Sequence, residues 1–411
     1  MKVWVKLLIG SILGIALGLL VHENQRLVEA MVWLEQFALR IGRYAVIPML
    51  VFLLTIGIYE LWQDKQFWPL VMKICLMIVG VSILMIVMGV LATLAFPPAR
   101  IPILAEEQLE LIRLDVTQNI KDLFPYNMFS ALSGDGAYLF PVCVFAFFLG
   151  VGLSQKRSYN KPVIALVDSL SHVFYNIALF FIEILGFIMI VLSCYWAIRF
   201  REVLRAEIYL DLILLLGIFA IVLGFGILPM LLYFVRPKVN PWTVLYGSLG
   251  PAIAAFFSGD VNFSLPVLLS HAQENLGVQR RSNAVSLTLF STFCRAGSVT
   301  AATVAFIVIF KSYSSLGITS AEIFSIGIRA LIISFFLARH PGDGAYTALA
   351  VLCLGYGKGF EAGYLILKPL AFYLVAIGAF LDVMIAAFAS YAAARLSGFV
   401  EERTGHHSIR V

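Results

Sequence analysis

Two short polar runs interrupt a chain that is otherwise mostly apolar. They are SGDVNFS (258–264) and RHPGDG (339–344), and each joins charged or hydroxyl side chains to glycine. Glycine permits unusual backbone angles, and Pro341 has no backbone N–H, so neither run favours continuous helix. An apolar piece follows each run. The N-terminus of a helix there would present free N–H donors and about half a positive charge. The pattern predicts two helix ends that could hold a charged ligand.

The composition predicts an all-α integral membrane protein. Of 411 residues, 61% are hydrophobic and 13% are charged, whereas soluble domains carry about 25% charged residues. A spanning helix needs about 20 apolar residues. The segments expected to cross are 3–21, 44–62, 69–97, 138–155, 172–198, 209–235, 284–310 and 362–396.

The apolar pieces beside the two polar runs are too short to cross in the same way. They cover 242–257, 323–338 and 345–356. Non-helical backbone inside a bilayer is tolerated only where protein or water satisfies it. We therefore expect two re-entrant hairpins whose tips face a polar cavity. Ordinary loops at the membrane surface are the alternative.

Charge and cysteine usage narrow the class of function. The net charge of +5 is spread over short loops, which fits membrane topology better than nucleic-acid binding. Placing both termini in the cytoplasm puts the cluster Lys156–Arg157–Lys161 inside and the acidic loop with Glu106, Glu107, Glu110 and Asp115 outside. The five cysteines form no CxxC pair, and the tail pair His406–His407 is expected to be solvated. No cofactor, metal site or enzyme is expected.

Several motifs appear in a recognisable order. They are YAVIPMLVFLLTIGI (44–58), LFPYNMFSAL (123–132), FAFFLGVGL (145–153), AAFFSGDVNFSLPVLLSHAQENLGV (254–278) and LARHPGDGAYTALAVL (337–352). Together they resemble the dicarboxylate/amino acid:cation symporter family, which has the glutamate-transporter fold. The resemblance implies eight transmembrane helices plus two opposed re-entrant helical hairpins, an elevator-type mechanism, a homotrimer and a cell-membrane location.

The same resemblance divides the single membrane domain, 1–411, into two sets of elements. Scaffold helices would cover about 1–62 and 138–198. The transport-domain elements would be 69–97, 209–235, hairpin one (241–275), helix seven (284–312), hairpin two (322–357) and helix eight (360–396).

The chain departs from the family pattern where ions and substrate are usually held. The seventh helix of the family carries N-M-D-G-T, but this chain reads Cys294-Arg295-Ala296-Gly297-Ser298, and only Asp382 remains as a mid-helix charge in the eighth. Sodium prefers oxygen ligands and is repelled by a neighbouring arginine, so its site is in question. Asp382, Asp260 or His340 could carry a proton instead.

The resemblance implies a set of site residues. Arginine can hold a carboxylate through two parallel hydrogen bonds. The implied substrate-binding residues are Arg295, Arg339, Ser258, Asp260, Asn262 and Asp343. The implied ion or proton coupling residues are Asp382, Gly297, Ser298 and His340, and the implied gate hinges are Gly259, Pro341, Gly342 and Gly344.

The function implied is a secondary active symporter. It would move a small organic anion, a dicarboxylate or acidic amino acid, with Na⁺ or H⁺ by alternating access. Two alternatives remain open. The arginines could pair with Asp260, Asp343 or Asp382 and only lock the hairpins. The chain could also be a transport-inactive, channel-like or sensor homologue that has lost ion coupling.

Overall fold

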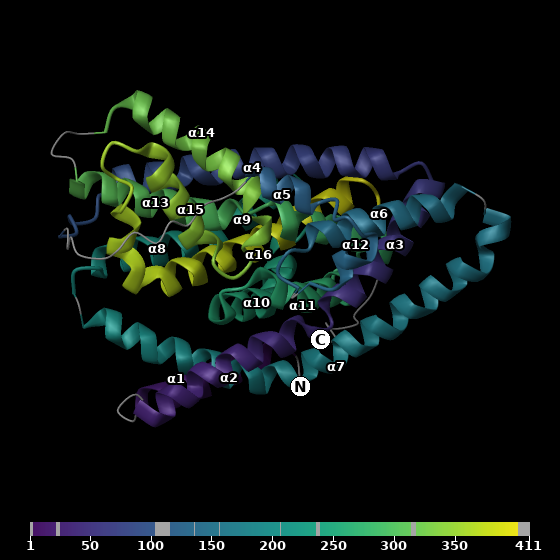
Figure 1. Cartoon of the computed structure of the whole chain (residues 1–411), viewed down its shortest axis with the longest axis horizontal. Coiled ribbons are helices and arrows are strands. Elements are labelled where there is room, and N and C mark those ends of the chain that lie inside the picture. Colours follow the sequence, from purple (N-terminus) through teal and green to yellow (C-terminus); the bar gives the residue numbers. More distant parts are fainter. Residues whose placement is uncertain are drawn as a thin grey trace.

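The computed structural model describes residues 3–21, 25–102, 116–134, 136–155, 157–205, 207–235, 239–313 and 318–401 (Figure 1). Within these ranges the regular elements are helices, and the β-structure is one isolated bridge between Val278 and Val400. Eight segments are long and apolar enough to cross a membrane: Val3–Leu20, Arg26–Gln63, Phe67–Ala95, Ser158–Leu204, Leu210–Val235, Arg280–Tyr313, Ser320–Arg339 and Gly363–Leu396. The chain is thus an all-helical, multi-pass membrane protein.

Two segments differ in length from the sequence prediction. Residues 138–155, expected to cross, form α6 (Phe140–Gln155), which has only 16 residues. Residues 323–338, expected to reach half-way, belong to a 20-residue helical segment, Ser320–Arg339, that is long enough to cross. Helix α14 (Ser320–Phe336) starts early because Thr319 and Glu322 form a capping box, which the apolar pattern alone does not show.

Helix α2 (Gln25–Tyr44) is absent from the predicted elements. Its glutamates, arginines and glutamines lower its hydropathy, so a search for apolar runs misses it. Only Ala45 separates α2 from α3 (Val46–Gln63). The end of α2 therefore lies next to α3, most of whose residues are buried.

Helix α1 (Val3–Val21) packs closely along α7 (Arg157–Leu204). Gly10, Gly14 and Gly18 face backbone carbonyls of α7 so closely that a Cβ on any of them would clash. With 48 residues, α7 extends over roughly 72 Å at ~1.5 Å per residue, more than twice the ~30 Å hydrocarbon core. Figure 1 shows it running beside the main bundle.

Helices α13 (Ala296–Tyr313) and α16 (Ala371–Leu396) form the centre of the bundle. They pack on each other and on α4 (Phe67–Ala95), and nearly all residues of α13 are buried. Gly297 permits their close approach, because a Cβ there would lie 2.6 Å from the backbone nitrogen of Asp382. The approach brings the start of α13 against the middle of α16.

Two helix pairs flank this centre. The first joins α10 (Pro241–Ser258) to α11 (Val261–Glu274). The second joins α14, through η3 (Leu337–Arg339), to α15 (Gly344–Tyr356). The polar runs identified in the sequence form both turns, which we call tip one (258–264) and tip two (339–344).

The remaining elements connect these parts. They are α5 (Val116–Asp122), η1 (Met128–Leu132), α8 (Leu210–Ile221), the π-helical η2 (Val222–Ile227), α9 (Leu228–Val235), α12 (Arg280–Phe293) and η4 (Gly363–Leu370). The polar stretch 98–137 contains two of these short helices, α5 and η1. The acidic cluster 106–115, Lys156 and the pair His406–His407 lie outside the described residues.

Candidate functional site

The two tips meet each other. The backbone N–H of Val261 donates to the carbonyl of Pro341 at 3.4 Å. A Cβ placed on Gly342 would lie 4.0 Å from the Cβ of Asp260. The structure thus brings together two runs that lie about 80 residues apart in the sequence.

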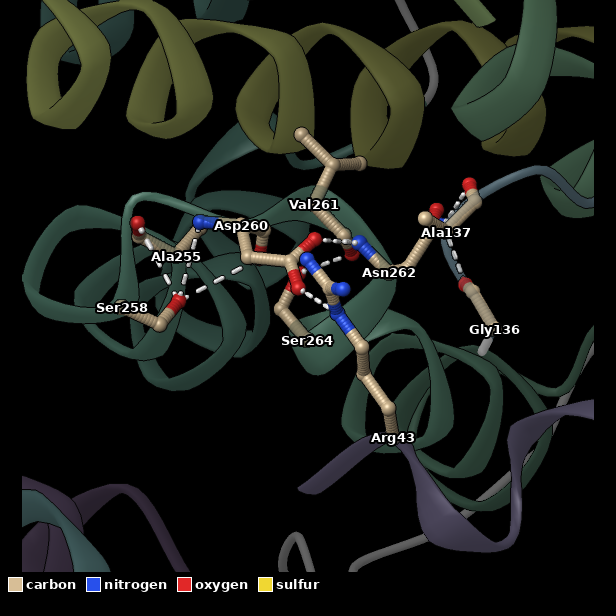
Figure 2. A network of polar contacts seen from close by, with 9 residues as sticks. All are labelled: Arg43, Gly136, Ala137, Ala255, Ser258, Asp260, Val261, Asn262 and Ser264. Atoms are coloured by element: carbon tan, nitrogen blue, oxygen red, sulfur yellow. Dashed lines mark hydrogen bonds and ion pairs between the residues drawn. The ribbon is translucent and has the colours of Figure 1, made fainter. Parts of the chain in front are cut away.

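Tip one is shaped by its own side chains. Gly259 ends α10 in the left-handed region, with φ of 65°, which a residue with a Cβ adopts at a cost. Asp260 caps α11 by accepting from the backbone N–H of Asn262 at 2.9 Å. Ser258 Oγ accepts from the backbone N–H of Asp260 at 3.1 Å. Figure 2 shows these contacts around one buried carboxylate.

Arg43, at the end of α2, is the main partner of that carboxylate (Figure 2). Its Nε donates to Asp260 Oδ2, and the Asp260 side chain is fully buried. A Cβ on Gly342 would lie 3.1 Å from Arg43 Nη2, so the guanidinium reaches tip two as well. Sequence reasoning missed Arg43. The available signal was an arginine directly before the apolar run 45–58, a costly place for a charge unless it is paired.

Asn262 ties tip one to the connection before α6. Its Nδ2 donates to the carbonyls of Gly136 at 3.0 Å and Ala137 at 2.9 Å (Figure 2). The side chain is thus occupied by protein backbone.

Tip two has its own polar cluster. His340 Nδ1 lies 3.2 Å from both carboxylate oxygens of Asp343, and Thr347 Oγ1 donates to Asp343 Oδ2 at 3.1 Å. Pro341 and Gly342 lie between the two members of this pair, and α15 begins at Gly344, directly after Asp343.

Arg339 faces another part of the protein. It pairs with Asp122 of α5, donates to Asn119 Oδ1 at 3.4 Å and lies 5.8 Å from the ring centroid of Tyr138. Its side chain is 44% exposed. The partner is none of the three aspartates weighed from the sequence.

Asp382 of α16 is held at the start of α13. It accepts from the backbone N–H groups of Gly297 at 2.7 Å and Ser298 at 3.1 Å, and from Ser298 Oγ at 2.6 Å. Residues 294–295 separate α12 from α13, so these N–H groups belong to the first turn of α13 and have no acceptor within that helix. The carboxylate thus caps α13 from a neighbouring helix.

Arg295 lies in the same break and is 1% exposed. Its Nη1 is 3.8 Å from Asp382 Oδ2, while its Nε and Nη2 have no hydrogen-bond partner in the part of the chain that the structure describes. Buried polar groups are almost always hydrogen-bonded, so two free donors on one buried guanidinium are exceptional. Nε and Nη2 form one edge of the guanidinium, the edge that can hold a carboxylate through two parallel hydrogen bonds.

The charges around Arg295 come from both tips. Asp382, Asp260 and Asp343 all act electrostatically on it. No group of three or more His, Cys, Asp or Glu side chains with metal-binding geometry occurs among the described residues. Arg295 is the group of this arrangement that can pair with an anion, through its Nε and Nη2.

A family model for the "Sodium:dicarboxylate symporter family" matches residues 3–397. The chain belongs to this family. It is a family of transporters, not of enzymes. This confirms the family resemblance of the sequence motifs.

Known transporters are similar to this chain at low identity. Neutral amino acid transporter A of Homo sapiens is 26% identical over 227 residues, 53% of this chain and 41% of that protein. The proton/sodium-glutamate symport protein of Bacillus subtilis (strain 168) is 25% identical over 183 residues, 42% of each protein. The excitatory amino acid transporter of Caenorhabditis elegans is 28% identical over 122 residues, 30% of this chain and 24% of that protein. The matched regions thus span less than half of these relatives.

Proposed function

We propose that the protein is a secondary active transporter of a small carboxylate, a dicarboxylate or an amino acid, coupled to Na⁺ or H⁺. The observation that carries the proposal is the Arg295 guanidinium. It is 1% exposed, and two donors on one of its edges have no partner among the described residues. A substrate carboxylate would satisfy both donors at once.

The two tips would be the gates of this site. We propose that α10–α11 and α14–α15 enter the membrane from opposite sides as re-entrant hairpins. The contact between Val261 and Pro341 supports this arrangement, because each tip joins two helices and both tips meet beside Arg295. Movement of either tip would open a route to the guanidinium.

The remaining predicted residues take narrower roles in this proposal. Asp260 and Asn262 already bind Arg43 and backbone carbonyls, so they shape the tip and do not reach for substrate. Asp382 already accepts three hydrogen bonds and faces Arg295, so a sodium ion at this carboxylate would have to replace these donors. A proton needs less rearrangement, which favours H⁺ over Na⁺ at Asp382. Elevator-type movement and a homotrimer follow only from the family and remain part of the proposal.

Uptake into proteoliposomes tests the proposal. Sodium and pH gradients are imposed separately, and labelled succinate, aspartate and a panel of neutral amino acids are supplied. Arg295→Gln should abolish uptake, and Arg295→Lys should raise KM because it loses the two-bond geometry. Arg281→Gln, which removes a partner of Asp64 away from the tips, is the matched control.

A second function has structural support. Arg43, Arg295 and Arg339 each face an aspartate, as in a protein whose hairpins are locked. A transport-inactive, channel-like or sensor homologue predicts that no gradient drives accumulation of any substrate in the panel. Gradient-driven accumulation that survives in Arg295→Gln would instead refute the carboxylate-binding role.

A further inference from the structure

A cavity of about 210 Å³ lies beside the two tips, and Arg295 is not among the residues that line it. It is bounded by α2, α7, α16 and both tips. The residues that line it at the tips are Ser258, Gly259, Gly342 and Asp343. At ~30 Å³ per water, its volume corresponds to roughly seven waters, the size of a small metabolite.

Aromatic side chains dominate the wall. Six of the fourteen lining residues are aromatic: Tyr195, Trp196, Phe256, Phe257, Tyr346 and Phe372. Trp196 is the centre of the group, with ring centroids 5.1 Å from Phe256, 5.7 Å from Phe257 and 5.9 Å from Phe372. Aromatic rings pack best against another ring, in offset or edge-to-face geometry. The wall therefore favours a ligand with an aromatic group.

The polar groups of the cavity are few and have opposite signs. Arg199 is the cation, and its guanidinium lies over the rings of Tyr195 and Phe372 at 5.6 and 5.5 Å. Trp196 Nε1, another donor of the lining, is buried and has no hydrogen-bond partner among the described residues. Glu35 and Asp343 are the acids of the lining.

This charge pattern selects among carboxylates. One carboxylate fits Arg199 and the indole N–H, and one ammonium fits Glu35 or Asp343. A dicarboxylate or an acidic amino acid would set its second carboxylate against those acids, and like charges at close range are unfavourable. A zwitterion with one group of each sign is the better match.

We propose that this cavity binds an α-amino acid with an aromatic side chain. The inference rests on the proposed transporter function and adds a second ligand site to it, because the cavity opens on both gate tips and is lined by residues other than Arg295. The ring packs among Trp196, Phe257 and Phe372, the carboxylate binds Arg199, and the ammonium binds Glu35 or Asp343.

Binding is tested on the purified full chain in lipid nanodiscs, by thermal unfolding and tryptophan fluorescence. L-Phenylalanine should raise the melting temperature and quench fluorescence, since Trp196 lines the cavity. Phenethylamine, 3-phenylpropionate, L-aspartate and succinate each lack at least one matching feature and should have at least tenfold lower affinity.

Substitutions of residues that line the cavity test whether phenylalanine binds there. Arg199→Gln should weaken phenylalanine binding at least tenfold, and Trp196→Phe should remove the fluorescence response while keeping the ring. Arg205→Gln and Phe187→Ala are matched controls, since neither residue lines the cavity and Phe187 is 74% exposed. No response to phenylalanine, an equal response to aspartate, or full binding by Arg199→Gln each overturns the inference.

The uptake panel separates this inference from the proposed function. Gradient-driven uptake of succinate without phenylalanine binding refutes the cavity assignment and leaves the transporter in place. Phenylalanine binding without gradient-driven uptake of any substrate keeps the cavity assignment and refutes the transporter.

Discussion

Replacing Arg43 with alanine should destabilise the protein more than any other single arginine change on α2. The substitution leaves the Asp260 carboxylate, which is fully buried, without its cation. Removing one partner of a buried ion pair typically costs about 3–5 kcal/mol. Asp260 keeps the hydrogen bond from the Asn262 N–H, so we expect a loss near the lower end, about 3 kcal/mol in the free energy of unfolding.

Removing the charge of Asp260 should destabilise the protein less than removing Arg43. Asp260→Asn keeps a side-chain oxygen that can cap α11, and asparagine is as good a cap as aspartate. Arg43 is 20% exposed, so its freed guanidinium can reach water. We expect a loss of about 1 kcal/mol, a typical value for one hydrogen bond. The double variant should lose only about 1–2 kcal/mol, because it no longer buries an unpaired charge.

Equilibrium unfolding of nanodisc-purified variants by a denaturing detergent measures these differences. Arg40→Ala is the matched control, since Arg40 lies one turn earlier on α2, is exposed and makes no ion pair within the described residues. The reasoning fails if Arg43→Ala is as stable as Arg40→Ala, or if the losses of the two single variants simply add in the double variant.

Two further changes test the packing around the tips. Gly297→Ala should lower the free energy of unfolding by about 1–3 kcal/mol through overpacking, because the new Cβ would meet Leu381 and the Asp382 nitrogen. Gly226→Ala is the control and should cost nothing comparable, because no atom lies within 4 Å of its Cβ position. Equal melting temperatures for the two variants would contradict the close approach at Gly297. Asn262→Ala removes two hydrogen bonds to the carbonyls at 136 and 137, worth about 1–2 kcal/mol together. Hydrogen exchange should speed up at residues 136–138, and unchanged exchange there would argue against the contact.

The sequence predicted the features that depend on local composition. The apolar runs predicted an all-helical membrane protein, and the order of motifs predicted the family; both are confirmed. The turns at 258–260 and 339–343 followed from glycine, proline and aspartate in runs where a helix cannot continue. The roles of the candidate site residues remain predictions.

Features that depend on distant contacts were not predictable. Arg43 and Asp260 lie 217 residues apart, and so do Arg339 and Asp122. No local pattern selects these partners, and several aspartates were equally plausible for Arg339. Helix α2 was not predicted because its polar face lowers its average hydropathy, although its apolar face packs against α7.

The interlocked contact between α1 and α7 limits how this protein can change shape. Three glycines spaced by one turn sit against α7 carbonyls, so a shift of one residue would drive neighbouring leucine and isoleucine side chains into that backbone. These two helices must therefore travel together or stay still together. Any large displacement has to take place along other surfaces, where α10 and α11 rest on this pair.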